Sequence, residues 1–155
     1  MKKASSVVSL LIIIGVIYWS FSDIKPSLPK DESLVKMGFS VYNALEHVKK
    51  ISKKEHYVGS KEHKNVQNYI VTELGLETEI QTETAVNKKW FAATTAQNIL
   101  AKIKGSKTGK ALMLLSHYDS NSHSSFGASD ASSGVATILE GIRAFLRKNQ
   151  TPKND

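Results

Sequence analysis

The chain has 155 residues, 21 Lys and Arg against 14 Asp and Glu, and a formal net charge of +7. It has no cysteine, which excludes a disulfide-stapled mini-protein, a cysteine-based zinc finger and a thiol enzyme. Hydrophobic residues make up 41% of the chain, which is compatible with a packed core and argues against wholesale disorder. The length predicts one domain.

The positive charge is scattered in short pairs such as Lys2–Lys3 and Lys49–Lys50, and no run reaches five like charges. No nucleic-acid-binding motif accompanies the lysines, so we expect a solvated basic surface and no nucleic-acid partner. A weak affinity for an anionic membrane surface stays open as an alternative.

An uncharged apolar stretch runs from Val7 to Phe21, directly after two lysines. Its length falls between that of a signal-peptide core and that of a full membrane span. Tyr18 and Trp19 near its end suit a membrane interface. We predict a signal anchor or transmembrane segment over residues 1–22, with the rest of the chain extracytoplasmic or lumenal. A cleaved signal peptide, which would make the protein secreted, and a buried core helix are the alternatives.

Residues 23–32 contain two prolines and no hydrophobic periodicity, which predicts a linker. Residues 33–155 then form the soluble domain. Its hydrophobic pattern predicts helices over 41–51, 62–74 and 130–147, strands over 76–84 and 98–103, and a short buried strand over 111–115. A polar loop at 116–129 joins the buried strand to the last helix. This order of strand, loop and helix indicates an α/β sandwich.

Three residues that could carry chemistry follow the expected buried strand. His117 lies just beyond its carboxyl end, where open α/β sheets place their ligand sites. Asp119 can accept a hydrogen bond from the second imidazole nitrogen, which would fix the tautomer of a metal-bound histidine. Asp130 stands at the start of the last predicted helix, where the helix dipole favours an ionised carboxylate.

Each of these residues also has an ordinary explanation. A histidine after a strand is usually a loop residue, Asp119 could form an Asx turn, and Asp130 could cap a helix. Their combination with a Ser- and Gly-rich loop is more specific. The loop is no nucleophile elbow, because Ala131 stands where that motif needs glycine, and it lacks the lysine of a phosphate-binding loop.

Four stretches together carry a family resemblance: the turn at residues 56–60, Asn98–Ile99, His-Tyr-Asp-Ser at 117–120, and residues 127–134. The chain resembles the di-zinc aminopeptidases of metallopeptidase family 28, in particular the membrane-anchored branch that includes endoplasmic-reticulum metallopeptidases. Tyr57 departs from the pattern, which has proline there. The resemblance implies an α/β fold of the three-layer zinc-exopeptidase type, preceded by the N-terminal anchor helix.

The resemblance also implies roles for the three residues. His117 would be a terminal ligand of one zinc ion, Asp119 would orient His117, and Asp130 would bridge two zinc ions. His and carboxylate ligands fit zinc on general grounds as well. The implied activity is hydrolysis of peptide substrates from their N-termini, with a glutamate as general base on a metal-bound water.

The family pattern further needs a Glu-Glu pair, another acidic residue and a final histidine. After Asp130 the chain has only Glu140 and Asp155 as carboxylates and no histidine. We therefore expect the N-terminal half of a longer enzyme, with an incomplete sandwich, low stability and no activity of its own. A non-catalytic membrane-tethered peptidase-like binding module, a pseudogene product and a basic membrane-surface protein are the alternatives.

Overall fold

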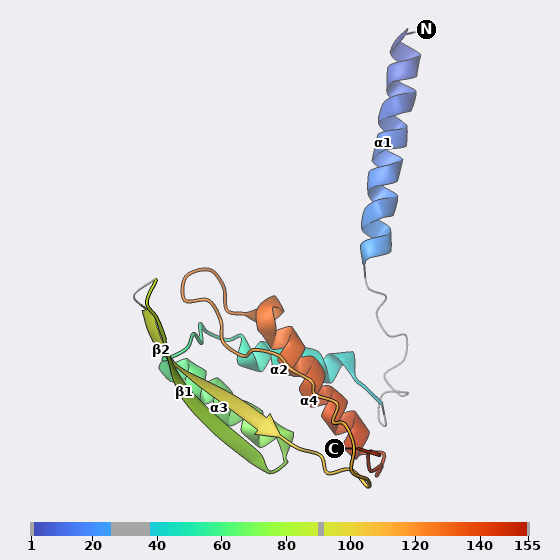
Figure 1. Ribbon diagram of the computed structural model, residues 1–155. Helices are drawn as coiled ribbons and strands as arrows, with labels where there is room; N and C mark the ends of the chain where they lie inside the picture. The colour runs from blue at the N-terminus through green and yellow to red at the C-terminus, as the bar shows by residue number, and fades with distance from the viewer. Residues whose placement is uncertain (1, 26–37, 90–91, 155) are drawn as a thin grey trace. The chain divides into compact units, whose positions relative to one another are not determined.

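The computed structural model describes residues 2–25, 38–89 and 92–154 of the chain. The chain forms two compact units, Met1–Asp31 and Glu32–Asp155. Among the described residues, the first unit holds one long helix and the second holds the other helices and the strands (Figure 1).

The helix of the first unit, α1, runs from Lys2 to Ile24. Its segment Ser6–Ile24 is long and apolar enough to cross a membrane, judged by length and composition alone, and a signal sequence near an N-terminus would pass the same test. The helix includes Asp23 and Ile24, which the sequence had placed in the linker. Residues 26–37, which hold most of that linker, lie outside the described residues.

Two capped helices open the second unit. α2 spans Val41–Ile51 and α3 spans Lys61–Leu74, which confirms both predicted helices to within one residue. The side chain of Ser40 caps α2, and the Oγ of Ser60 caps α3 by accepting a hydrogen bond from the backbone N–H of His63 at 3.0 Å. Gly75 ends α3 in the left-handed conformation, with φ 59°, as its position in the sequence predicted.

The sheet is a single antiparallel pair. Strand β1 spans Thr78–Asn87, β2 spans Ala92–Ala101, and the register pairs Thr78 with Ala101. Both strands were expected, but β2 begins at Ala92 rather than at residue 98. The sequence Ala-Ala-Thr-Thr-Ala-Gln has little alternation of its own, and its strand conformation comes from pairing with the Thr-rich half of β1.

The buried parallel strand expected at residues 111–115 is not formed. This segment is irregular, and Leu112 and Leu115 are 83% and 80% exposed. Within the described part of the chain the β1–β2 pair is the only sheet, so no neighbouring strand pairs with the segment. The described residues therefore give a mixed helix-and-sheet fold, without the parallel central sheet of the expected three-layer sandwich.

The last helix also begins later than expected. α4 spans Ser133–Leu146, and the preceding residues Ala128–Ser132 form a π-helical turn. Inside that turn Asp130 has an extended backbone, with φ −125° and ψ 93°. Asp130 therefore stands just outside α4, because the left-handed Gly127 starts a tight turn that delays the regular helix.

The core of the second unit lies where α2, α3 and α4 meet. α4 packs along α2, and α3 lies beside β2 (Figure 1). The buried cluster comprises Ile51, Val66, Ile70, Leu74, Val135 and Leu139. Ile99 of β2 and Tyr118 of the following loop pack against it. Tyr118 stands between His117 and Asp119 in the sequence. Its contact with the core therefore holds in place the loop that carries these two residues.

Candidate metal site

The loop that carries His117 and Asp119 is held in place by the residue between them. The hydroxyl of Tyr118 donates a hydrogen bond to the backbone oxygen of Gln97 on β2 at 2.9 Å. The Tyr118 ring stacks on the imidazole of His63, with centroids 4.6 Å apart and 15° between the ring planes. Backbone freedom at residues 117 and 119 is therefore restricted by contacts to β2 and α3.

The imidazole of His117 lies between two carboxylates. Its Nδ1 atom is 3.2 Å from Oδ1 of Asp119, and its Nε2 atom is 2.8 Å from Oδ1 of Asp130. Burial by itself lowers the pKa of His117, but the hydrogen bonds with Asp130 and Asp119 outweigh it and raise the pKa above its ordinary value. The structure thus brings together all three residues singled out from the sequence.

The turn that carries Asp130 depends on a close approach at Gly127. Its φ is 71°, and a Cβ atom there would lie 3.1 Å from Cβ of Ser120 and 3.2 Å from both the backbone oxygen of Asp130 and Cε1 of His56. Only glycine combines this backbone conformation with so little space. The turn is therefore pressed against the end of the loop that carries His117.

His56 joins this loop to the segment before α3. Its backbone N–H donates to Oγ of Ser120 at 2.8 Å, and the backbone N–H of Ser120 donates to the backbone oxygen of His56 at 3.3 Å. The side chain of His56 is fully buried, with Nδ1 2.9 Å from the backbone oxygen of Lys54. The sequence had identified residues 56–60 only as a turn, so this supporting contact was missed.

Two buried polar residues on α3 were missed as well. His63 and Gln67 are 5% and 1% exposed, and Gln67 donates to Oε1 of Gln97 at 3.1 Å and to the Tyr118 hydroxyl at 3.3 Å. Both continue the helical spacing of the apolar residues Val66, Ile70 and Leu74. That spacing was the available signal for their burial, although polar side chains are usually expected at the surface.

The site offers the types of donor atom that zinc ions bind in proteins. A neutral imidazole nitrogen and a carboxylate oxygen are ordinary zinc ligands, and in His117 and Asp130 they are already neighbours. Among the described residues, however, no group of three or more potential ligands is close enough together to hold a metal. His117 and Asp130 therefore supply part of a zinc site, since four ligands are usual.

Comparison with known proteins agrees with this location. The sequence profile of Peptidase family M28 matches residues 98–155, which include His117, Asp119 and Asp130. The search of the curated proteins gave no match.

Several solved structures share the fold. Glutaminyl cyclase from Porphyromonas gingivalis is 23% identical with a TM-score of 0.58, over 69% of this chain and 40% of that one. The glutaminyl cyclase of an Acidobacteriales bacterium is 17% identical with a TM-score of 0.59, over 83% of this chain and 45% of that one. A leucine aminopeptidase precursor from Bacteroides thetaiotaomicron is 21% identical with a TM-score of 0.55, over 73% of this chain and 43% of that one.

The chain thus spans less than half the length of these structures. Over residues 98–155 the chain is similar to Peptidase family M28, and the second unit shares the fold of these solved structures. Identities of this size show a shared fold and carry no statement about activity.

Proposed function

We propose that the chain is part of a zinc-dependent metallopeptidase of the aminopeptidase type, acting on the N-termini of peptide substrates. The observation that carries the proposal is the position of the His117 imidazole between Asp119 and Asp130, inside the segment that matches Peptidase family M28. His117 and Asp130 would hold zinc, and further ligands would have to come from outside the described residues.

The chain's own residues would prepare the ligand. If Asp119 accepts a hydrogen bond from Nδ1–H of His117, a metal ion would have to take the place of the proton that Nε2 shares with Asp130. Asp130 has a second carboxylate oxygen, which would allow it to bridge two ions. Bound zinc would supply an activated water and polarise the peptide carbonyl.

The first unit would tether the enzyme. α1 is apolar enough to serve as a signal anchor, with the peptidase domain lumenal or extracytoplasmic, as in the endoplasmic-reticulum branch of the family. Cleavage of this segment would instead give a secreted protein. Protease protection of the second unit in sealed microsomes distinguishes a lumenal domain from a cytoplasmic one.

A glutaminyl cyclase activity is the second candidate, because proteins of that name are among the solved structures with the same fold. The chain supplies only part of a zinc site, so little activity is expected of it alone. Any activity found can be assigned on one preparation with an aminoacyl anilide and with a peptide that begins with glutamine. Chelator-sensitive hydrolysis of the anilide supports the peptidase. Chelator-sensitive loss of ammonia from the glutamine peptide favours the cyclase.

Zinc binding tests the site itself. Isothermal titration of the full chain with zinc should show only weak binding, because two ligands are too few for a tight site, and that binding should be lost in His117→Ala and in Asp130→Ala. His123→Ala is the matched control, because His123 is an exposed histidine of the same loop. If His117→Ala and His123→Ala bind zinc equally well, the proposed site is wrong, and the non-catalytic binding module becomes the better explanation.

A further inference from the structure

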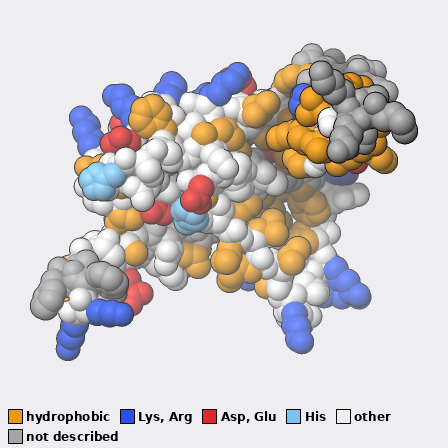
Figure 2. Space-filling model, turned by 90° about the horizontal axis from the view of Figure 1, so that it is seen from above, with side chains coloured by type: hydrophobic (Ala, Val, Ile, Leu, Met, Phe, Trp, Pro, Cys, Tyr) orange, Lys and Arg blue, Asp and Glu red, His pale blue; other side chains and the backbone are white. Residues whose placement is uncertain are grey.

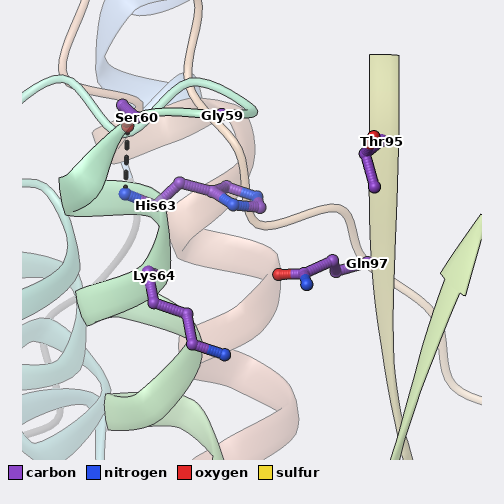
Figure 3. A pocket seen from close by; sticks show the side chains of 6 residues that line it. All are labelled: Gly59, Ser60, His63, Lys64, Thr95 and Gln97. Carbon is purple, nitrogen blue, oxygen red and sulfur yellow. Dashed lines mark hydrogen bonds between the residues drawn. The ribbon is translucent and has the colours of Figure 1, made fainter. Parts of the chain in front are cut away.

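A cavity of about 240 Å³ lies between the start of α3 and strand β2, beside the candidate metal site. Its lining residues are Gly59, Ser60, His63, Lys64, Thr95 and Gln97 (Figure 3). The space is several times the volume of one water molecule, which is about 30 Å³ in the liquid. It can therefore accept a small molecule or ion of several non-hydrogen atoms.

The polar groups around this cavity favour negative charge. The ammonium group of Lys64 donates one hydrogen bond to Gln67, which leaves two of its three N–H groups for a ligand. The first turn of α3 contributes the positive end of the helix dipole. Within the described part of the chain, no carboxylate lines the cavity. Glu62 of the same turn lies outside the lining and accepts a hydrogen bond from Asn65 at 3.1 Å.

The imidazole of His63 gives an independent indication of a ligand. It is 5% exposed and projects from α3 toward β2, where it lines the cavity (Figure 3). One ring face is covered by Tyr118. Within the described residues no hydrogen bond involves its ring nitrogens. The hydrogen bond to Ser60 is donated by the backbone N–H of His63. A ring nitrogen of His63 can therefore donate a hydrogen bond to an acceptor atom placed in the cavity.

One lining residue, Gln97, belongs to a hydrogen-bonded group. Gln67, Gln97 and Tyr118 are joined by hydrogen bonds, and Tyr118 stands between His117 and Asp119. Tyr118 thus connects a lining residue of the cavity with the loop of the candidate metal site. The two sites are nevertheless distinct, since no lining residue belongs to both.

We propose that this cavity binds a small oxyanion, a carboxylate or a phosphate, through Lys64, His63 and the amide of Gln97. The proposal does not depend on the metallopeptidase function, because neither zinc nor catalysis is needed for binding. Carboxylates and phosphates offer the same acceptor oxygens, so experiment must identify which of the two binds.

The test is an NMR titration of the ¹⁵N-labelled full chain in neutral detergent, at constant pH, with sodium phosphate and separately with sodium acetate. The probe is the set of ring signals of the five histidines, with the His63 signals assigned by their loss in His63→Phe. Sodium chloride at equal ionic strength is the reference. A saturable shift confined to His63 is expected with at least one anion, and the anion that produces it identifies the class.

Two lysine variants test the assignment of the cavity. Lys64→Gln should weaken binding about tenfold, because it removes a charge-assisted hydrogen bond. Lys61→Gln, on the same helix turn but outside the lining, removes the same charge and should leave affinity within about twofold. Lys64 is exposed, so the substitution should not affect folding. Equal weakening by both variants, equal shifts at all five histidines, or no saturable shift with either anion would overturn the proposal.

Discussion

Arg143 binds both carboxylate oxygens of Glu140, a side chain with no solvent exposure. Nε of Arg143 lies 2.5 Å from Oε2, and Nη2 lies 2.5 Å from Oε1. The backbone N–H of Ser40 donates to Oε1 at 2.6 Å, and Nη2 of Arg143 also donates to the backbone oxygen of Gly38. This ion pair on α4 therefore holds the segment that precedes α2 against α4.

Replacement of Glu140 should destabilise the second unit strongly. Glu140→Gln leaves the Arg143 charge without its partner, and breaking a buried pair costs about 3 kcal/mol or more. Urea unfolding at neutral pH measures this loss. Glu46→Gln is the control, because Glu46 forms a solvent-exposed pair with Lys49 and should contribute little. A similar stability for the two variants would contradict the role given to the buried pair.

The same pair predicts a dependence of stability on pH. Burial raises the pKa of Glu140, but hydrogen bonds from Arg143 and Ser40 outweigh it and hold the pKa below its ordinary value of 4.5. A carboxyl group with a lowered pKa in the folded state stabilises that state above its unfolded pKa. Its contribution is lost as the pH falls below 4.5 and through the lowered folded value. The difference in unfolding free energy between the wild type and Glu140→Gln should therefore shrink over that range.

Gly127 and Gly75 form a matched pair for separating backbone strain from crowding. Both have positive φ, 71° and 59°, but a Cβ at Gly75 would meet nothing within 4 Å, whereas one at Gly127 would press on Ser120, Asp130 and His56. Gly75→Ala should cost about 1 kcal/mol from the left-handed backbone alone. Gly127→Ala should cost more and should disturb the His117 ring signals. Equal thermal stability of the two variants would show that the turn at Gly127 relaxes freely.

How far the sequence predicts this structure depends on how local the determining contacts are. The helices at 41–51 and 62–74 were predictable, because their caps and apolar spacing lie within the segments themselves. The π-helical turn before α4 was not predictable from the sequence. It forms where Gly127 lies close to Ser120 and His56, and neither residue belongs to the same local segment. A pattern of local periodicity contains no information about such contacts.

The residues of the candidate site were likewise predictable only in part. His117, Asp119 and Asp130 were identified by their spacing, and the structure brings them together, while their roles as ligands stay predictions. His63 and Gln67 were missed because buried polar residues interrupt the apolar pattern on which core prediction depends. The lysines were expected to form a solvated surface, and on the face drawn in Figure 2 the basic side chains are spread around the edge.

Asp119 should control the zinc affinity of His117 without binding the ion. Asp119→Asn removes the charged acceptor beside Nδ1, and loss of such a partner typically lowers metal affinity about tenfold or more. Isothermal titration with zinc measures the change. Asn121→Ala is the control, because the Asn121 side chain accepts only the backbone N–H of His123 in the same loop at 2.9 Å. An unchanged affinity in Asp119→Asn would remove Asp119 from the site.

The apolar run Leu112–Leu115 offers a test of the expected strand against the observed structure. The four side chains are 61–83% exposed, and within the described residues no strand pairs with them. Unpaired backbone N–H groups exchange with solvent far faster than those of a regular helix. Hydrogen exchange followed by mass spectrometry should therefore show rapid exchange in this run and slow exchange in α4. Equal protection of the two segments would mean that the run is paired in solution, through another chain or a segment outside the described residues. In that case the strand expected from the sequence would exist in the assembled protein, and the carboxyl end of that strand would carry His117 as first predicted.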